Sequence, residues 1–330
     1  MCLGMTFPLS LILINYNHSK YLEKAIKQRL KQKDFFLELI IVDDGSTDKS
    51  PSIIKKYQEK NSFIKAIFHE RNRGIFQAVS SGISISEGKY VHMGAVDDLL
   101  DDNFFEKSVN ILDKYPKASF VFSDPGEFIE KKDIYINFPF HFSSKSRYFS
   151  PKDVKSLLRK SYFTFPSMAC IFHKKKFLEV GGFREDLERN CDLFTTFLLA
   201  FKHGVCYVPE VLSWFCIRGD SYSAIGLRDK KNKRETFYKT FDILEKEYKE
   251  EYVNFREAGI SYEHSFRAIY WLLISKRHRK YITFFLIKRM VSRGFWGFVR
   301  KMLPLVLRKF IRKIKGKYSV KQIKEDSYDA

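Results

Sequence analysis

The sequence has few cysteines, and their spacing excludes some common classes of small protein. Only five occur among the 330 residues, and no two of them stand in a CxxC arrangement. A small disulfide-stapled fold is therefore excluded, and a structural zinc site is not expected. Because most of the cysteines lie within apolar strings, we interpret them as reduced core thiols in a reducing compartment.

Long apolar runs are missing too. The longest candidate, residues 282–287, is far shorter than the roughly 20 apolar residues that a bilayer-crossing helix needs. The first residues also lack the positive charge that opens a secretory signal peptide. We therefore expect neither a membrane-spanning helix nor a secretory signal.

Several catalytic motifs are absent as well. The sequence has no nucleophile elbow, no GxGxxG and no catalytic Cys/His pair, which argues against a covalent hydrolase and a nicotinamide cofactor. His69, His92 and His173 stand at strand positions without the spacing of metal ligands. We interpret these three as core or surface histidines.

Acidic residues are missing from one long stretch near the C-terminal end. The formal net charge is +20, and residues 271–318 contain 15 Lys and Arg but no Asp or Glu. Elsewhere the composition, with 45% hydrophobic and 16% aromatic residues overall, suffices for a sizeable core and argues against disorder. The length allows one large domain with an extension, or two domains.

The first two-thirds of the chain alternates short apolar runs with segments of helical period. This alternation predicts an α/β fold, with a Rossmann-like, mostly parallel sheet covered by helices on both faces. Residues 124–150 have no clear period and predict a loop excursion or a small hairpin. The expected strands are residues 9–14, 37–42, 63–68, 89–94, 118–123, 168–173 and 204–210, and the expected helices include residues 75–85, a segment from residue 151, and residues 191–201.

The composition changes after about residue 228. Long, charge-rich, helix-favouring stretches follow, first balanced in charge and then wholly basic. We therefore expect a catalytic domain over residues 1–227 and a basic helical extension over residues 228–330. In the last helix of this extension, apolar residues follow a helical spacing while Lys and Arg cover much of the remaining surface.

Polar side chains follow four of the predicted strands. In an open α/β sheet, ligands bind outside the carboxyl ends of the strands, so polar strand ends in series favour a ligand site. A simple turn is the alternative for each of them, with Ser46 or Thr47 capping one helix and Asp98 capping another. The four clusters are Asn15 with Asn17, Asp43 with Asp44, Asp97 with Asp98, and Ser123 with Asp124.

Three segments resemble a known family. VDDGSTD after an apolar strand, then NRG, then GKYVHMGAVDD, is similar to the family 2 glycosyltransferases of GT-A fold, and the resemblance covers roughly residues 8–223. It implies transfer of a sugar from a nucleotide-diphosphate donor, with a UDP-sugar expected, to an acceptor hydroxyl. It also implies inversion at the anomeric carbon and a divalent metal, Mg²⁺ or Mn²⁺, on the diphosphate.

The resemblance assigns roles to the acidic segments. Ala95 stands where the first Asp of the family's DxD signature often lies, which leaves Asp97 as the expected metal ligand and Asp98 as a donor contact. The metal neutralises the charge that grows on the leaving diphosphate. In the same family, residues matching Asp43 and Asp44 approach the uracil or the ribose.

Further donor contacts are implied at two loops. The backbone around Asn15 and Tyr16 is expected to close over the base. Arg73, in the NRG segment, is a candidate phosphate contact, with a solvated surface arginine as the alternative. Downstream, Arg218 and Ser221 are further candidates for the donor phosphate.

Inversion requires one general base that takes the acceptor proton. In the family an Asp supplies it at the start of a helix after a GGF turn, and here GGFREDLERNCD follows that outline. Asp192 lies nearest to the expected helix start and is our candidate. Glu188 and Asp186 stay open, as does a purely structural carboxylate at the helix N-terminus.

The basic extension predicts a partner. Large apolar residues among Lys and Arg, with acids excluded, fit helices that lie on an anionic leaflet. We expect residues 280–317 to dock there, so that the protein is cytoplasmic and peripheral on the inner face of the cell membrane. Nucleic acid is a less favoured partner, and helices packed back on the catalytic domain are a further alternative.

The leading hypothesis is an inverting, metal-dependent glycosyltransferase that builds a surface polysaccharide by adding sugar to a glycan or a lipid-linked acceptor. The alternative is a catalytically silent GT-A domain that binds a nucleotide sugar or a partner at the membrane surface.

Overall fold

One sheet runs through the part of the chain that the computed structural model describes, which is residues 7–217, 233–260, 266–288 and 290–291. Its strands are β1 (Leu9–Asn15), β2 (Glu38–Asp43), β3 (Ile64–Phe68), β4 (Tyr90–Ala95), β5 (Leu99–Leu100), β6 (Phe120–Ile129), β7 (Ile134–Asn137), β8 (Arg147–Phe149), β9 (Cys170–His173) and β10 (Val205–Cys216). The order is β3-β2-β1-β4-β9-β6-β10-β5, with β7 beside β6 and β8 beside β10.

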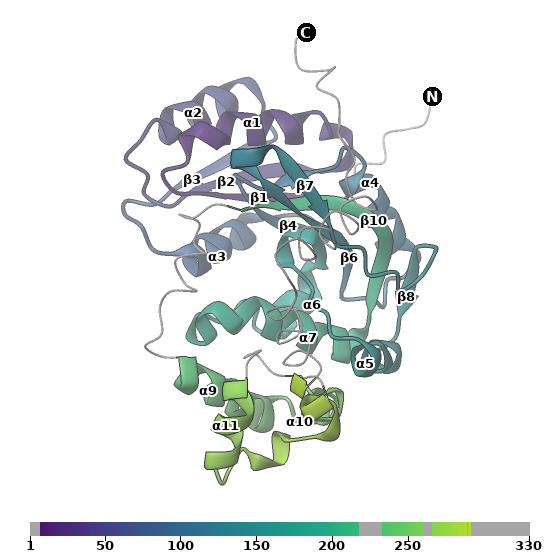
Figure 1. Ribbon diagram of the computed structural model, residues 1–330. Helices are drawn as coiled ribbons and strands as arrows, with labels where there is room; N and C mark the ends of the chain where they lie inside the picture. The colour runs from purple at the N-terminus through teal and green to yellow at the C-terminus, as the bar shows by residue number, and fades with distance from the viewer. Residues whose placement is uncertain (1–6, 218–232, 261–265, 289, 292–330) are drawn as a thin grey trace.

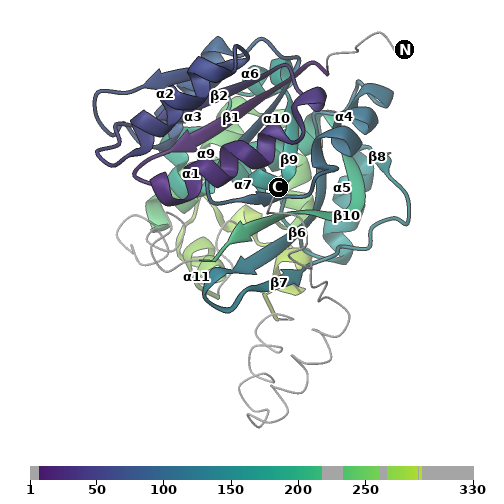
Figure 2. The ribbon, with the colours of Figure 1, turned by 90° about the horizontal axis from the view of Figure 1, so that it is seen from above.

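Helices cover both faces of this sheet (Figures 1 and 2). The α-helices are α1 (Ser19–Leu30), α2 (Ser50–Lys60), α3 (Ile75–Ile85), α4 (Phe104–Lys114), α5 (Pro151–Lys160), α6 (Lys174–Glu179), α7 (Cys191–His203), α9 (Lys233–Glu247), α10 (Lys249–Ala258) and α11 (Phe266–Ile274). Short 3₁₀ turns are η1 (Lys33–Phe35), η2 (Glu130–Lys132), η3 (Ser167–Ala169), η4 (Glu185–Asn190) and η5 (Arg279–Tyr281).

Two hydrophobic cores lie between the sheet and the helices on its two faces. One core joins the sheet to α1, α2 and α4, and the other joins the opposite face to α3, α5, α6 and α7. Helices α9, α10 and α11 continue the second core and form an outer layer beyond α7, at the bottom of Figure 1. The predicted α/β sheet with helices on both faces is confirmed.

The central strands form because their residues are apolar on both faces. All six residues of β2 are buried, and six of the seven in β1 are as well, as expected for parallel strands covered on both sides. β1 pairs in parallel with β2 and with β4, and β2 with β3. The predicted strands at residues 9–14, 37–42, 63–68 and 89–94 match these four to within a residue or two at each end.

The predicted end of the strand at residue 123 is wrong. β6 continues to Ile129, because it pairs in parallel with β10 along its length and in antiparallel fashion with β7. Asp124 is therefore buried inside the sheet, where it accepts hydrogen bonds from the Tyr207 hydroxyl at 2.8 Å and the Phe140 amide at 3.0 Å. The small hairpin expected within residues 124–150 is present as β6 and β7.

The helix caps that we gave as alternatives at two of these turns are not formed. α2 begins at Ser50 with Lys49 at the N-cap position, so neither Ser46 nor Thr47 caps it. α4 begins at Phe104 after Asn103, well past Asp98. The side chains of Ser46, Thr47 and Asp98 are thereby left for other contacts.

The C-terminal helices pack through aromatic side chains. Phe255 of α10 contacts Phe194, Phe197 and Phe201 of α7. The domain boundary that we predict at residues 227/228 falls within 218–232, outside the described residues, and stays a prediction. Within the described ranges, no helix is long and apolar enough to span a bilayer.

The cysteines that the structure describes are free thiols. Cys170, Cys191, Cys206 and Cys216 are all buried, as expected for core residues. Cys2 lies outside the described residues. Burial raises the pKa of the Cys206 thiol to about 12, so it stays protonated at neutral pH.

Candidate active site

The sheet contains a topological switch point next to β1. The chain proceeds from β1 to β2 and β3 on one side, and then returns to place β4 on the other side of β1. In such sheets the crevice for a ligand opens at the carboxyl ends of the strands that flank the switch. Asn15 of β1 pairs with Asp43 of β2, and Ile14 pairs with Ala95 of β4, so the carboxyl ends of these three strands meet there.

Asn15 and Asp43 form a buried hydrogen-bonded pair at this edge. The Asn15 amide Nδ2 donates to Asp43 Oδ1 at 2.7 Å and to Ser46 Oγ at 3.1 Å. Ser46 in turn donates to Asp43 from its hydroxyl at 2.6 Å and from its backbone N–H at 3.1 Å. Among the described residues, Asn15 Oδ1 has no hydrogen-bond partner although it is buried. A buried amide oxygen without a partner is costly, so this atom is a candidate ligand contact.

The loop after β1 is tied to the loop after β2. Asn17 has φ 53°, a left-handed conformation that Asn tolerates better than most residues. Its backbone N–H donates to Ser46 Oγ at 2.8 Å, and its Oδ1 accepts from the Thr47 amide at 2.8 Å. Tyr16, between the two asparagines, is 41% exposed.

Asp44 has a different set of partners from Asp43. Its Oδ1 lies 2.7 Å from His69 Nδ1 and accepts from the Arg73 amide at 2.9 Å, while its Oδ2 accepts from the Gly74 amide at 2.9 Å. Gly74 has φ 87° at the N-cap of α3, a conformation that favours glycine. Asp44 thus fixes the backbone of the 69–74 loop, and the exposed Arg73 side chain extends from that loop.

The turn after β4 carries Asp97 and Asp98. The Ala95 amide donates to Asp98 Oδ2 at 3.2 Å, and the Asp98 amide donates to the Ala95 oxygen at 3.3 Å, so Asp98 closes the turn. Both carboxylates are half-buried. They follow the strand that lies directly beside Asn15, which places them at the same sheet edge as Asp43.

A buried arginine supports this turn from below. Arg29 of α1 is 2% exposed, and its Nη1 lies 2.9 Å from Gln28 Oε1 and 3.5 Å from the Asp98 oxygen. Burial lowers the pKa of Arg29 to about 10, and the charges of Asp98 and Asp97 oppose that shift. Gln28 also donates to the Leu100 oxygen at 2.6 Å. α1 therefore contacts the turn at Asp98 and the strand that follows it at Leu100.

Asp192 lies at the start of α7. Its Oδ1 accepts from the Leu193 amide at 2.7 Å. Burial, and then the charge of Asp192, raises the pKa of the Cys170 thiol at the start of β9. β9 runs antiparallel to β4 with Ile171 opposite His92, which places Cys170 toward the carboxyl end of β4.

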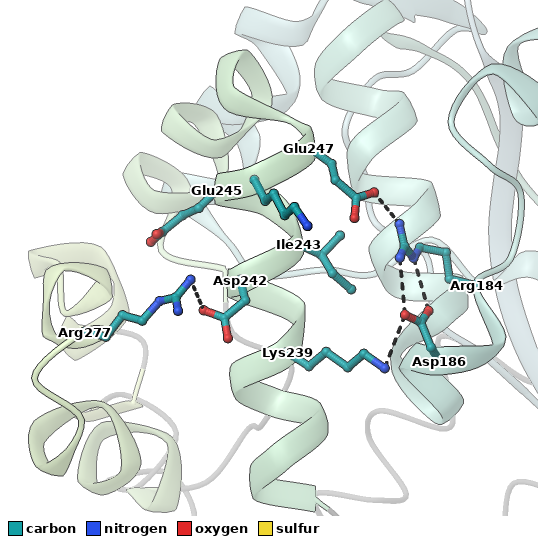
Figure 3. Close-up of a pocket in the computed structure, with 9 residues that line it drawn as sticks. Arg184, Asp186, Lys239, Asp242, Ile243, Glu245, Glu247 and Arg277 are labelled. Carbon is teal, nitrogen blue, oxygen red and sulfur yellow. Dashed lines mark hydrogen bonds and ion pairs between the residues drawn. The ribbon is translucent and has the colours of Figure 1, made fainter.

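Asp186 occupies a separate groove, shown in Figure 3. This groove has a volume of about 520 Å³ and lies between η4 and α9. Arg184 contacts both carboxylate oxygens of Asp186 at 3.1 and 3.2 Å, and Lys239 lies 3.3 Å away. The hydrogen bonds from Arg184 lower the pKa of Asp186, which makes it a weak proton acceptor.

The sequence did not indicate two residues that support the site. His69 was interpreted as a core or surface residue, yet it bridges Asp44 and Ser81, with Nε2 lying 3.0 Å from the Ser81 hydroxyl. Arg29 was not among the candidate residues. The roles of His69 and Arg29 depend on contacts with residues far away in the sequence, and local patterns do not indicate such contacts. Arg218 and Ser221 lie outside the described residues.

The fold is that of a solved glycosyltransferase. The crystal structure of S. aureus TarS 1-349 in complex with UDP-GlcNAc matches 76% of this chain and 70% of its own chain, with a TM-score of 0.60 and 16% identity. Together with the parallel sheet and its switch point, this likeness defines the GT-A fold.

The family model for glycosyl transferase family 2 matches residues 10–178, just over half of the 330 residues. The chain therefore belongs to the family 2 glycosyltransferases. It is 34% identical over 102 residues to glycosyltransferase GlyG of Streptococcus pneumoniae serotype 4, covering 31% of this chain and 34% of that protein. It is 31% identical over 145 residues to the minor teichoic acid biosynthesis protein GgaB of Bacillus subtilis, covering 43% of this chain and 16% of that protein. The chain thus spans about a third or less of the length of these two relatives.

Proposed function

We propose that this glycosyltransferase moves a sugar from a UDP-linked donor, with inversion, to a hydroxyl of a glycan or lipid-linked acceptor in cell-surface polysaccharide synthesis. The main support for this proposal is that Asn15, Asp43 and the Asp97–Asp98 turn lie at one sheet edge, at the switch point. The solved relative bound to UDP-GlcNAc supports the donor class, and the teichoic acid relative supports the surface polymer.

The nucleotide occupies the side of β1 and β2. Asn15 Oδ1 is a buried acceptor whose partner is missing among the described residues, and the imide N–H of uracil is a donor of the required kind. Asp43 has one oxygen that receives only a single 3.1 Å hydrogen bond, and ribose hydroxyls can donate to it. The exposed Tyr16 ring covers the base.

The diphosphate lies toward the Asp97–Asp98 turn. Carboxylate oxygens are ligands that Mg²⁺ and Mn²⁺ accept, and one or two of them with substrate phosphates make a usual site for Mg²⁺. Within the described ranges, no three His, Cys, Asp or Glu side chains gather in a metal-holding arrangement, so the donor phosphates supply the other ligands in this proposal. Asp97 holds the metal, which when bound neutralises the leaving diphosphate, and Asp98 and the Arg73 guanidinium contact the donor.

Asp192 is the proposed general base. Its carboxylate takes the proton from the acceptor hydroxyl while that oxygen forms a bond to the anomeric carbon, and the bond to the diphosphate oxygen breaks on the opposite face with its electron pair. Asp186 is less suited because Arg184 lowers its pKa. Glu188, with φ 47° in the turn before α7, is the remaining alternative.

The basic extension is proposed to hold the enzyme on the inner face of the cell membrane. Anionic lipid is the partner of residues 280–317 in this proposal, of which 289 and 292–317 lie outside the described residues. Each Lys or Arg near an anionic leaflet contributes about 1 kcal/mol to binding.

The test is a screen of nucleotide sugars by thermal shift with and without Mn²⁺, followed by UDP release. A ligand that binds only the native state raises the melting temperature by mass action. We expect UDP-sugars to raise it more with Mn²⁺ and to release UDP when an acceptor is added. A donor that binds but never releases UDP with any glycan or lipid-linked acceptor would indicate a silent binding domain.

A further inference from the structure

Helix α11 is apolar at eight of its nine positions. Its sequence is FRAIYWLLI, with one charged residue in nine. Ala268 and Leu272 are fully buried against the helical layer, and Tyr238 of α9 donates to the Trp271 oxygen at 2.6 Å. A helix that packs on one side and faces solvent on the other usually carries polar residues outward. α11 does not.

The outward side of this helix is exposed and apolar. Tyr270 is 61% exposed, Leu273 52% and Ile274 47%. These residues stand at positions i, i+3 and i+4, so they form one continuous stripe, which we call the α11 outer face. Exposed apolar patches of this kind mark interaction surfaces more often than scattered single residues do.

A second apolar row follows shortly after α11 in the chain. Phe284 is 71% exposed, Ile287 43% and Val291 55%, at positions i, i+3 and i+7. Leu286 and Met290, between them, are buried. This segment belongs to the same lower layer of the molecule as α11 in Figure 1.

The segment that carries both rows, residues 266–291, contains Lys and Arg but no acidic residue. Acidic residues do not occur between residues 271 and 318, whereas Lys and Arg are frequent there. Arg277 pairs with Asp242 at 2.8 Å and Lys280 with Glu245 at 2.6 Å, which neutralises the nearby acids of α9. Lys276 and Lys288 are exposed.

We propose that the α11 outer face, together with Phe284, Ile287 and Val291, inserts into the headgroup region of an anionic lipid membrane. This inference deepens the membrane association proposed above and rests on it, but it places the contact on described residues and extends it to α11. Apolar side chains that enter the interface, ringed by cations, are the arrangement that binds anionic bilayers.

Other occupants fit these observations less well. Two copies of the chain would bring like-charged surfaces together, which opposes self-association. A nucleic acid would use the Lys and Arg side chains but would leave the exposed apolar rows in water. Lipid alone satisfies both the charge and the apolar residues.

The experiment is co-sedimentation of the full chain with vesicles of phosphatidylglycerol and phosphatidylcholine, compared with vesicles of phosphatidylcholine alone. The test variants are Leu273→Gln with Ile274→Gln, and Phe284→Gln. The matched control is Leu178→Gln with Val253→Gln, which changes side chains of similar exposure, 51% and 48%, on α6 and α10. Melting temperature, solution mass and UDP release without vesicles are measured for every variant.

We expect the wild type to bind the phosphatidylglycerol vesicles and each test variant to lose about tenfold or more in affinity, because each large apolar side chain that leaves water contributes at that scale. The control variant should bind as the wild type does. UDP release in solution should stay unchanged, which separates a failure of docking from a failure of catalysis.

Three results would overturn the proposal. One is vesicle binding that the test variants retain, or that the wild type never shows. Another is a wild-type dimer that the test variants convert to a monomer, which would assign the face to a second copy. The third is a large fall in melting temperature with unchanged vesicle binding, which would mean that another segment of the chain covers α11.

Discussion

Asp44 receives a hydrogen bond from His69 Nδ1 at 2.7 Å, whereas its neighbour Asp43 receives one from Asn15 at the same distance. Two adjacent carboxylates thus serve two different loops. Asp44 organises the 69–74 loop that presents Arg73, and Asp43 lies at the switch point beside β1. The two adjacent acids of the family signature therefore differ in role: Asp44 is structural, and Asp43 is a proposed donor contact.

These different roles predict that one substitution lowers stability and the other lowers UDP affinity. Asp44→Ala leaves the Arg73 and Gly74 amides and His69 without their acceptor, so we expect a loss of about 2 kcal/mol or more in the free energy of unfolding. Asp43→Ala should instead weaken UDP binding at least tenfold. Urea denaturation and calorimetric titration with UDP measure the two quantities. Equal loss of UDP affinity with unchanged stability in both variants would contradict this difference in role.

The proposed base gives a kinetic prediction. Asp192→Asn should lower kcat/KM by about 10²- to 10⁴-fold and remove the acidic limb of the pH–rate profile, because the amide accepts no proton. UDP affinity should change little. Asp186→Asn is the matched control and should keep the wild-type profile, since Asp186 is paired with Arg184 in the groove of Figure 3. If Asp186→Asn loses the activity and Asp192→Asn keeps it, the assignment is reversed.

Arg29 predicts a long-range stabilisation of the Asp97–Asp98 turn. Arg29→Met removes the buried positive charge beneath the two carboxylates, and we expect the free energy of unfolding to fall by about 1–3 kcal/mol. Lys27→Met on the same helix removes only the surface ion pair of Lys27 with Glu23, in which the charged atoms are 3.6 Å apart. This change should alter the free energy of unfolding by about 0.5 kcal/mol or less. Chemical denaturation compares them, and similar small losses in both variants would show that Arg29 does not support the turn.

His92 predicts a pH dependence of stability. Burial lowers its pKa to about 3, so the folded protein keeps the imidazole neutral, while the unfolded chain protonates it near pH 6.5. Between these values the unfolded state binds more protons, and stability must fall as the pH drops, by up to about 1.4 kcal/mol for each pH unit. His92→Gln, which can still donate to the Met168 oxygen, should flatten this dependence between pH 6.5 and pH 4. An unchanged slope would assign the acid sensitivity to other groups.

Local sequence patterns predict those helices and strands whose residues follow a single spacing of apolar side chains. β1, β2 and α3 have the predicted ranges to within a residue or two because apolar runs and helical spacing act over a few neighbours. The predicted strand ended at residue 123 because residues 124–150 have no clear period, while pairing with β7 and β10 keeps residues 124–129 in the sheet. Pairing between distant strands is invisible to a local pattern.

The same distinction applies to the candidate site. The acidic segments were found from their position after apolar strands, which is a local signal. Arg29 and Asp98 are 69 residues apart, and His69 and Asp44 are 25 apart, so their contacts depend on the assembled sheet. Ser46 was expected to cap a helix, but Asp43 and Asn15 recruit its hydroxyl instead.

The central claim is that the acids on one sheet edge converge on a divalent cation and the diphosphate that it binds. Calorimetric titration of UDP with and without Mn²⁺ into the wild type and Asp97→Asn tests it most directly, with Asp102→Asn as an exposed control on the following loop. We predict that Mn²⁺ tightens UDP binding in the wild type and in Asp102→Asn but not in Asp97→Asn. Equal coupling between Mn²⁺ and UDP in all three proteins would contradict the claim.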